Sequence, residues 1–200
     1  MSETSDSRSR MLRTAARLLQ RQGYHATGLR QILAESGAPR GSLYFHFPGG
    51  KEELAVAAVQ GMSKRIARLI AQLLGAYADP ADAIDAFVRA FAEILRASNY
   101  AEGCPVATVT LEAAASSTAI RAACEEAYGE WQRQIAAYLT GAGVPVAQAE
   151  PLATLVLAAA EGGLILSRAR RDIEPLTTVA TQLATILRSA VAEAGKRKRR

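Results

Sequence analysis

The chain has 200 residues, of which half are hydrophobic, 22% are charged and only 6% are aromatic. This length suffices for one large or two small domains with a buried core, and the apolar content exceeds that of disordered chains. Ala supplies 42 residues, and runs of alternating β-branched or aromatic residues are missing. The composition therefore excludes a β protein and predicts an all-α fold.

Membrane and secretory classes are not indicated. The longest apolar run, Leu152–Ala160, is too short to span a bilayer. The polar residues 1–10 lack the apolar core of a secretory signal. Cys104 and Cys124 have no CxxC spacing and fit a reducing compartment. We therefore expect a soluble, cytoplasmic protein without a membrane partner.

The net charge of +5 is distributed unevenly along the chain. Residues 1–50 carry seven basic and three acidic side chains (+4), residues 51–195 carry twelve and sixteen (−4), and Lys196–Arg200 add +5. A basic start and a basic tail on an acidic body are typical of a protein that binds a polyanion at one end. A solvated first helix and a frayed tail would give the same pattern, so charge alone leaves both interpretations open.

Three helices are predicted before residue 50, and their spacing is that of a helix-turn-helix. They cover about residues 7–22, 28–36 and 40–45, with stops at Gly23 and Gly37, an N-cap at Thr27 and Pro39 in the first turn of the third.

The third of these helices carries the side chains needed to contact DNA. Arg40, Ser42, Tyr44 and His46 offer hydrogen-bond donors or positive charge, and Gly41 allows a close backbone approach. A purely structural helical corner would more often carry apolar residues at several of these positions. The pattern therefore indicates a helix that enters a major groove.

A family resemblance follows from four consecutive segments. They are residues 23–27 (GYHAT), 32–37 (ILAESG), 41–47 (GSLYFHF) and 51–54 (KEEL). With their spacing intact they resemble the DNA-binding domain of the TetR family of transcriptional repressors. Leu33, Gly28 and the pair Gly49-Gly50 depart from the usual family pattern. The loop around Gly49-Gly50, together with Gly103-Cys104-Pro105, resembles a subgroup of multidrug-efflux and flavonoid-responsive regulators.

The rest of the chain predicts six further amphipathic helices, about nine in all. We expect a DNA-binding domain over residues 1–50, a ligand-binding and dimerisation domain over residues 51–195, and a basic tail over residues 196–200. The predicted helices are about residues 51–77, from near 80 through 95, 105–115, 118–140, 147–170 and 175–193, with Thr118 as a cap.

The middle helices bring together most of the large aromatic residues, with a few polar groups among them. An apolar helical cavity with convergent polar groups is the usual form of a small-molecule site, and in TetR-like repressors this region holds the inducer. For any single residue, plain core packing is the competing interpretation. The predicted ligand-binding residues are Met62, Ile66, Phe87, Phe91, Cys104, Thr108, Glu112, Tyr128, Trp131 and Ile135.

The last two predicted helices differ from the others in their apolar pattern. The helix over residues 147–170 is apolar nearly all round, with Gly162-Gly163 permitting close approach or a bend, and the last helix has coiled-coil-like spacing. TetR-like proteins dimerise through their last two helices, whereas ordinary intrachain packing is the alternative. The predicted interface residues are Leu155, Leu164, Leu166, Leu176, Val179, Leu183 and Leu187.

The resemblance implies a homodimeric repressor on a pseudo-palindromic operator, released when a small, largely apolar molecule moves the helix that begins at Lys51. It implies double-stranded DNA, an inducer and a second copy of the chain as partners. The expected DNA-binding residues are Thr27, Arg30, Gln31, Arg40, Gly41, Ser42, Tyr44, His46 and Lys51. Thr27 and Lys51 stand at helix starts, where phosphates bind well.

Other function classes have weaker support. The only histidines are His25 and His46, and the HExxH, GxSxG and Walker A patterns are missing, so we expect no catalytic residue, metal or cofactor. A redox-responsive regulator through Cys104 and a non-specific polyanion-binding protein remain as alternatives.

Overall fold

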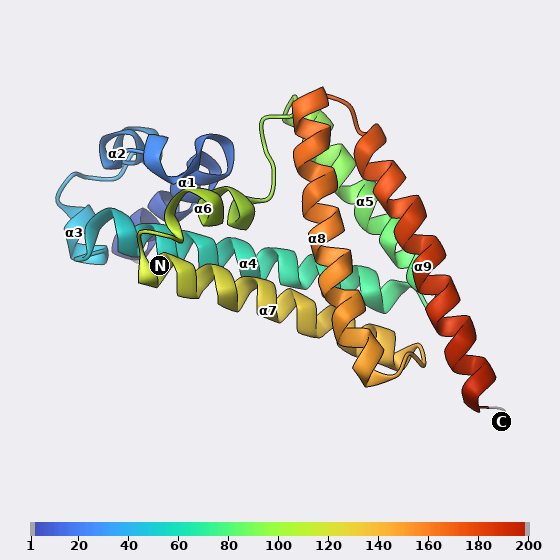
Figure 1. Ribbon diagram of the computed structural model, residues 1–200. Helices are drawn as coiled ribbons and strands as arrows, with labels where there is room; N and C mark the ends of the chain where they lie inside the picture. The colour runs from blue at the N-terminus through green and yellow to red at the C-terminus, as the bar shows by residue number, and fades with distance from the viewer. Residues whose placement is uncertain (1–2, 199–200) are drawn as a thin grey trace. The chain divides into compact units, whose positions relative to one another are not determined.

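The computed structural model describes the backbone of residues 3–198 and the side chains of residues 6–195. Within this part of the chain it contains nine helices and no strand, which confirms the predicted all-α fold (Figure 1). The helices are α1 (Glu3–Ala26), α2 (Leu29–Ser36), α3 (Ser42–His46), α4 (Gly50–Ala76), α5 (Pro80–Ala97), α6 (Pro105–Ala113), α7 (Thr118–Gly141), α8 (Val146–Arg170) and α9 (Glu174–Lys198).

The chain divides into two compact units. The first contains residues 1–65 and 104–127, and the second contains residues 66–103 and 128–200. Helices α4 and α7 each contribute residues to both units. By packing, the first unit takes in more of the chain than residues 1–50, because the start of α4 and all of α6 belong to it. The predicted tail, Lys196–Arg200, lies outside the described side chains.

In the first unit, α1 packs against α2, α3 and α6. Its buried face is formed by Met11, Ala15, Leu18 and Leu19. The predicted break at Gly23 is confirmed, since this residue interrupts α1 with φ 77° and ψ −175°. Residues with a Cβ atom rarely adopt such a backbone conformation, so glycine is required there. The chain can thereby turn sharply between α1 and α2.

Two predicted helix caps differ from the structure. Gly28, not Thr27, is the N-cap of α2. Thr27 is buried, and its hydroxyl donates to the Gly23 carbonyl at 2.6 Å, which ties it to the break in α1. At α7 the cap is Ser117, whose Oγ accepts from the Ile120 N–H at 3.0 Å. The prediction at Thr27 was wrong because its hydroxyl bonds back to Gly23, and the one at Thr118 was wrong because Ser117 supplies the capping oxygen.

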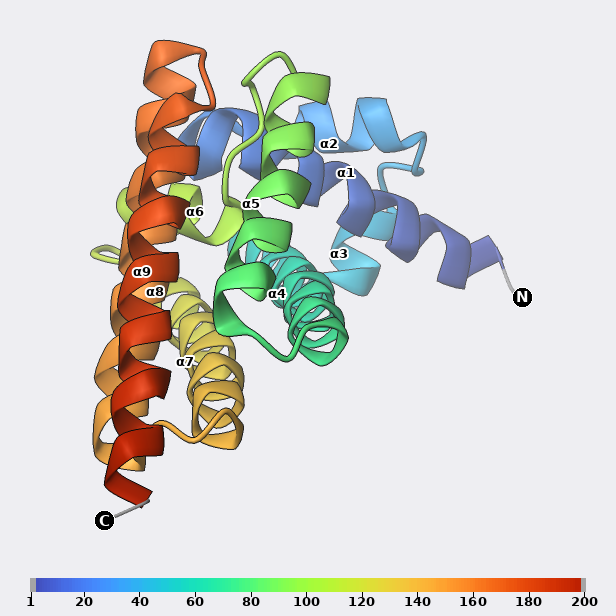
Figure 2. The same ribbon diagram turned by 90° about the vertical axis from the view of Figure 1, so that its right-hand side faces the viewer.

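In the second unit, α9 packs along both α5 and α8 (Figure 2). Helix α5 begins with the capping carboxylate of Asp79, which accepts from the Ala81 N–H at 2.8 Å. Gly163 of α8 permits a close approach, since a Cβ atom there would lie 3.0 Å from Leu176 Cδ1. The sequence-based expectation of close helix packing is therefore confirmed at Gly163.

Helix α8 is long and apolar enough, by length and composition alone, to cross a membrane. The shorter apolar run in the sequence did not suggest this. A core helix passes the same test, and α8 buries Ala153, Val156, Ala160 and Leu164 inside the second unit. The apolar character of α8 is thus explained in part by packing within the protein.

Candidate functional site

Helix α3 turns two aromatic side chains to the outside. Leu43 and Phe47 are each only 1% exposed and anchor the helix in the core of the first unit. Tyr44 and Phe45, which lie between them in the sequence, are 63% and 74% exposed. Exposing two neighbouring large aromatics is unfavourable unless the surface serves a contact. Helix α3 therefore presents a candidate binding surface.

Polar candidates from the sequence surround these aromatics in the chain. Arg30, Arg40 and Gly41 are exposed, and a Cβ atom at Gly41 would meet nothing within 4 Å. The Ser42 hydroxyl donates to the Pro39 carbonyl at 2.7 Å, which closes the turn into α3. The exposed guanidinium groups can neutralise phosphates, while Gly41 leaves room for the backbone to approach a ligand.

Three other predicted DNA-binding residues are buried or form hydrogen bonds with other residues of the protein. Thr27 is buried. The Gln31 side chain accepts from Gln22 Nε2 and donates to Glu35 Oε1, both at 2.9 Å. His46 Nε2 lies 3.1 Å from Ser7 Oγ, which joins α3 to α1. These contacts give the three residues a role in holding the helices in place.

Lys51 stands in the first turn of α4. Its ammonium group lies 4.4 Å from the centre of the Tyr24 ring and donates to the His25 carbonyl at 3.4 Å. Burial lowers the pKa of Lys51, and the charge of Glu112 opposes this shift. Burial, followed by the charge of Glu52, raises the pKa of Tyr24. Lys51 is thus a cation held in a defined place near the end of α1.

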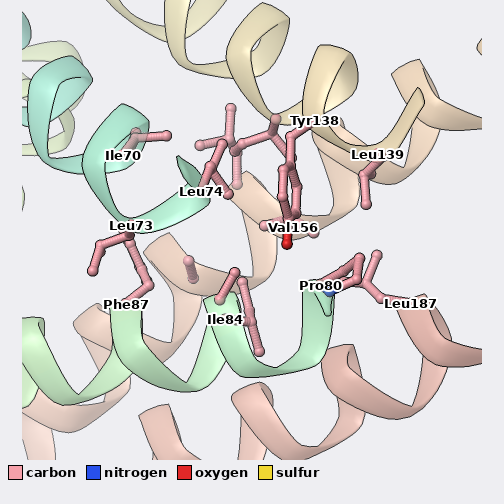
Figure 3. Close-up of a pocket in the computed structure, with 14 residues that line it drawn as sticks. Ile70, Leu73, Leu74, Pro80, Ile84, Phe87, Tyr138, Leu139, Val156 and Leu187 are labelled. Carbon is pink, nitrogen blue, oxygen red and sulfur yellow. The ribbon is translucent and has the colours of Figure 1, made fainter. Parts of the chain in front are cut away.

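The second unit contains an apolar cavity of about 50 Å³ (Figure 3). The Tyr138 hydroxyl at its edge donates to the Tyr77 carbonyl at 2.9 Å. Burial, with the nearby Asp79 and Asp82, raises the pKa of Tyr138, so this group stays neutral. The lining residues are Ile70, Leu73, Leu74, Pro80, Ala83, Ile84, Phe87, Ile135, Tyr138, Leu139, Val156, Leu157, Ala160 and Leu187.

Only two of the ten predicted ligand-binding residues, Phe87 and Ile135, line this cavity. Two aromatic pairs form in the same unit, Phe87–Phe91 and Tyr128–Trp131, with ring centres 4.5 and 5.4 Å apart. Four of the ten, Met62, Cys104, Thr108 and Glu112, belong to the first unit, while Ile66 lies in the second and outside this lining.

Sequence reasoning missed most of the cavity because its lining is aliphatic. The prediction relied on aromatic and polar residues, whereas the end of α4 contributes Leu73 and Leu74 and the middle of α8 contributes Leu157. The available signal was the presence of apolar residues on more than one face of these helices. The sequence-based prediction also missed Phe45 as a candidate contact residue. Its neighbours Leu43 and Phe47, four residues apart, occupy the buried face of the helix.

The predicted interface residues fall into three groups by exposure. Leu155 and Leu166 are 43% and 49% exposed. Two residues that were not predicted, Ile165 and Ile186, are also exposed, at 51% and 40%. Val179 is half-buried. The other predicted residues are buried within the subunit because α5, α8 and α9 pack on one another: Leu164, Leu176, Leu183 and Leu187.

The remaining chemistry of the described residues is sparse. No group of three or more His, Cys, Asp or Glu side chains that could hold a metal is found among them. Cys104 and Cys124 are buried and are not joined in a disulfide. Burial raises the pKa of Cys124 and outweighs a hydrogen bond with Thr110, which acts in the opposite direction.

Comparison with known proteins adds independent findings. Residues 11–58 match the family model of bacterial regulatory proteins of the tetR family. Residues 80–182 match the C-terminal domain of LmrA/YxaF-like transcriptional regulators. The first match covers the helix-turn-helix, and the second covers ten of the fourteen residues that line the apolar cavity.

Curated relatives resemble the chain over nearly its full length. The HTH-type transcriptional regulator LmrA of Bacillus subtilis (strain 168) is 41% identical over 183 residues, which are 92% of this chain and 97% of LmrA. The regulator YxaF of the same organism is 40% identical over 188 residues, which are 94% of this chain and 98% of YxaF. The crystal structure of a TetR regulatory protein from Rhodobacter sphaeroides superposes with a TM-score of 0.79 at 24% sequence identity. The match covers 88% of this chain and 96% of that protein's chain, and it supports the fold. The chain therefore belongs to the TetR family of bacterial transcriptional regulators, and its C-terminal domain is of the LmrA/YxaF type.

Proposed function

We propose that this regulator is a cytoplasmic, dimeric repressor that leaves its operator when a small apolar molecule binds the second unit. The observation that carries the proposal is the exposure of Tyr44 and Phe45 on α3. Arg40 precedes these aromatics and Lys51 follows them, so the surface combines positive charge with flat apolar groups. DNA offers both a phosphate backbone and base edges to such a surface.

In this proposal α3 enters the major groove of one half-site. Arg40 and Ser42 approach base edges or phosphates, and Tyr44 donates its hydroxyl to a phosphate. Arg30 and Lys51 neutralise flanking phosphates. Phe45 has no hydrogen-bond donor, so its partner is apolar, and the C5-methyl group of thymine is the apolar feature of the major groove.

The dimer is proposed to form through the exposed apolar side chains of α8 and α9. Leu155, Ile165, Leu166 and Ile186 expose between 40% and 51% of their surface. Exposed aliphatic residues on two neighbouring helices favour a four-helix interface around a two-fold axis. A two-fold axis matches an operator with two inverted half-sites.

The inducer is proposed to occupy the apolar cavity. Its lining contains no charged side chain, and the Tyr138 hydroxyl is bonded to the Tyr77 carbonyl. A neutral, hydrocarbon-rich compound therefore fits the chemistry. A volume of about 50 Å³ holds only a few heavy atoms, and we propose that a larger ligand widens the space between the surrounding helices.

This widening supplies a physical basis for release. Ile70, Leu73 and Leu74 line the cavity from α4, and the same continuous helix carries Lys51 in its first turn. A ligand that binds better to the widened state shifts the population away from the state that fits DNA.

The proposal is tested by fluorescence anisotropy with the DNA that flanks the regulator's own gene, at fixed salt. We compare the wild type with Tyr44→Ala and Lys51→Ala, and use Lys64→Ala, which removes an exposed charge from the middle of α4, as the control. We expect saturable binding that prefers this DNA. The first two variants should weaken it, and the control should bind like the wild type. Equal, salt-sensitive binding of every duplex by all proteins would contradict it and indicate non-specific binding through the tail.

A further inference from the structure

The end of α1 is closed by a carboxylate from another helix of the first unit. Glu112, near the end of α6, lies directly over Gly23. A Cβ atom at Gly23 would stand 1.8 Å from Glu112 Oε1 and 2.4 Å from its Cδ. The absence of a side chain at Gly23 thus serves two purposes: it permits the positive φ, and it makes room for this carboxylate.

Glu112 holds the turn after Gly23 through two hydrogen bonds with His25. The backbone N–H of His25 donates to Glu112 Oε2 at 2.9 Å. The Nε2 atom of the His25 ring lies 3.0 Å from the backbone carbonyl oxygen of Glu112. Because a carbonyl oxygen only accepts, the ring donates from a protonated Nε2. The position of residues 24–26 is therefore fixed by α6.

The same turn provides the seat of Lys51. The His25 carbonyl accepts from the Lys51 ammonium at 3.4 Å, and the Tyr24 ring lies beneath that ammonium at 4.4 Å. Both partners of Lys51 therefore belong to the segment that Glu112 holds. The acidic side chain of Glu112 also favours the charged form of Lys51.

A hydrogen bond also joins the segment between α6 and α7 to the first turn of α4. The Ser117 hydroxyl donates to the Glu52 carboxylate, next to Lys51 in the chain. Helix α6 is thus connected to the end of α1 by Glu112 and to the first turn of α4 by the residue that caps α7.

We infer that Glu112 is a positioning residue for DNA binding: through the His25 turn it holds Lys51 where that cation meets an operator phosphate. The inference rests on the proposed operator binding and assigns Glu112 a different role from the ligand contact expected from the sequence. If Glu112 acts in this way, the substitutions of Glu112 and of Lys51 remove the same contact, that of the Lys51 ammonium with the operator phosphate.

A double-mutant cycle of Glu112→Ala and Lys51→Ala, measured by anisotropy on the operator across a salt series, tests this. Each single variant is expected to weaken binding on the order of tenfold and to reduce the slope of log K against log salt by about 1.8, which is two phosphates per dimer. In the Lys51→Ala background, Glu112→Ala is expected to add no further loss. Full additivity, or a Glu112→Ala variant with wild-type affinity and slope, would overturn the inference.

Conservative and charge-matched variants separate positioning from general damage. Glu112→Gln keeps a carbonyl oxygen for the His25 N–H, so we expect binding within about twofold of the wild type. Glu126→Ala removes an exposed carboxylate of the same unit and should leave the salt slope unchanged. A Glu112→Gln variant as weak as Glu112→Ala would contradict the role of the hydrogen bond. If the wild type itself shows no preference for the operator, it is the proposed function that fails.

Discussion

His46 Nε2 lies 3.1 Å from Ser7 Oγ and so joins the last residue of α3 to the beginning of α1. Ser7 is buried, whereas the aromatic residues before His46 are exposed. The contact fixes one end of α3 against α1 and leaves Tyr44 and Phe45 to face outward. The orientation of the candidate DNA-binding surface therefore depends on residues far from it in the sequence.

His46→Ala is expected to lower stability by about 1 kcal/mol, the usual net contribution of one hydrogen bond. Operator binding should weaken because α3 is less well held, but the slope of log K against log salt should not change. Urea unfolding and a salt titration measure the two effects. A slope reduced as in Lys51→Ala would instead make His46 a phosphate contact.

Phe45→Ala should remove an apolar contact with thymine. Replacing operator thymines by deoxyuridine, one position at a time, deletes single C5-methyl groups. We expect one position per half-site at which this weakens wild-type binding several-fold but leaves Phe45→Ala unaffected, in line with about 0.8 kcal/mol for one buried methyl or methylene group. Melting temperature serves as the folding control, since Phe45 is 74% exposed. Equal sensitivity of both proteins at every position would argue against this contact.

Leu166→Glu is expected to dissociate the dimer. The side chain is half exposed in the isolated chain, so the charge is tolerated in the monomer but would be buried unpaired at the interface. Sedimentation equilibrium measures the shift from dimer to monomer. Ile94→Glu on α5, which is 38% exposed, is the matched control and should remain dimeric. A dimeric Leu166→Glu protein would place the interface elsewhere.

Ala160→Val should fill part of the apolar cavity. Its two added methyl groups occupy a volume similar to the cavity's about 50 Å³, so we expect stability within about 1.5 kcal/mol of the wild type. Naphthalene, as an apolar probe, should raise the melting temperature of the wild type and not that of the variant. An equal rise in both proteins would show that the probe binds at another place.

The two buried cysteines should be unreactive in the native protein. Burial raises the pKa of Cys124, so its thiolate fraction at neutral pH is smaller than that of an ordinary thiol. Because the folded state holds this proton more tightly, stability should fall as the pH rises above the ordinary thiol value. Titration with Ellman's reagent, native and in denaturant, measures reactivity. Rapid native modification of Cys104 would favour the redox-responsive alternative.

Local patterns in the sequence were sufficient to predict most of the fold. Helix periodicity, together with glycine and proline breaks, predicted the helices of the structure, and GSLYFHF with its neighbours indicated the family. The cap assignments at Thr27 and Thr118 failed because the Thr27 hydroxyl bonds to the Gly23 carbonyl four residues earlier and because Ser117 supplies the capping oxygen of α7.

The candidate sites were less predictable because they depend on contacts between distant residues. Nothing in the local sequence shows that Glu112 faces Gly23, 89 positions earlier, so it was assigned to the ligand pocket. The leucines of α9 repeat regularly whether they pack inside the subunit or against a second one. Only burial separates Leu183, which is 3% exposed, from Ile186, which is 40% exposed.

The most direct test of the central claim is a hydroxyl-radical footprint on the DNA that flanks the regulator's own gene. The proposal predicts two symmetric protected half-sites whose centres are about one helical turn, or a multiple of it, apart. Protection should disappear in the Tyr44→Ala, Lys51→Ala double variant and persist in Lys64→Ala. Uniform protection along the DNA, or a pattern unchanged in the double variant, would contradict operator recognition by α3.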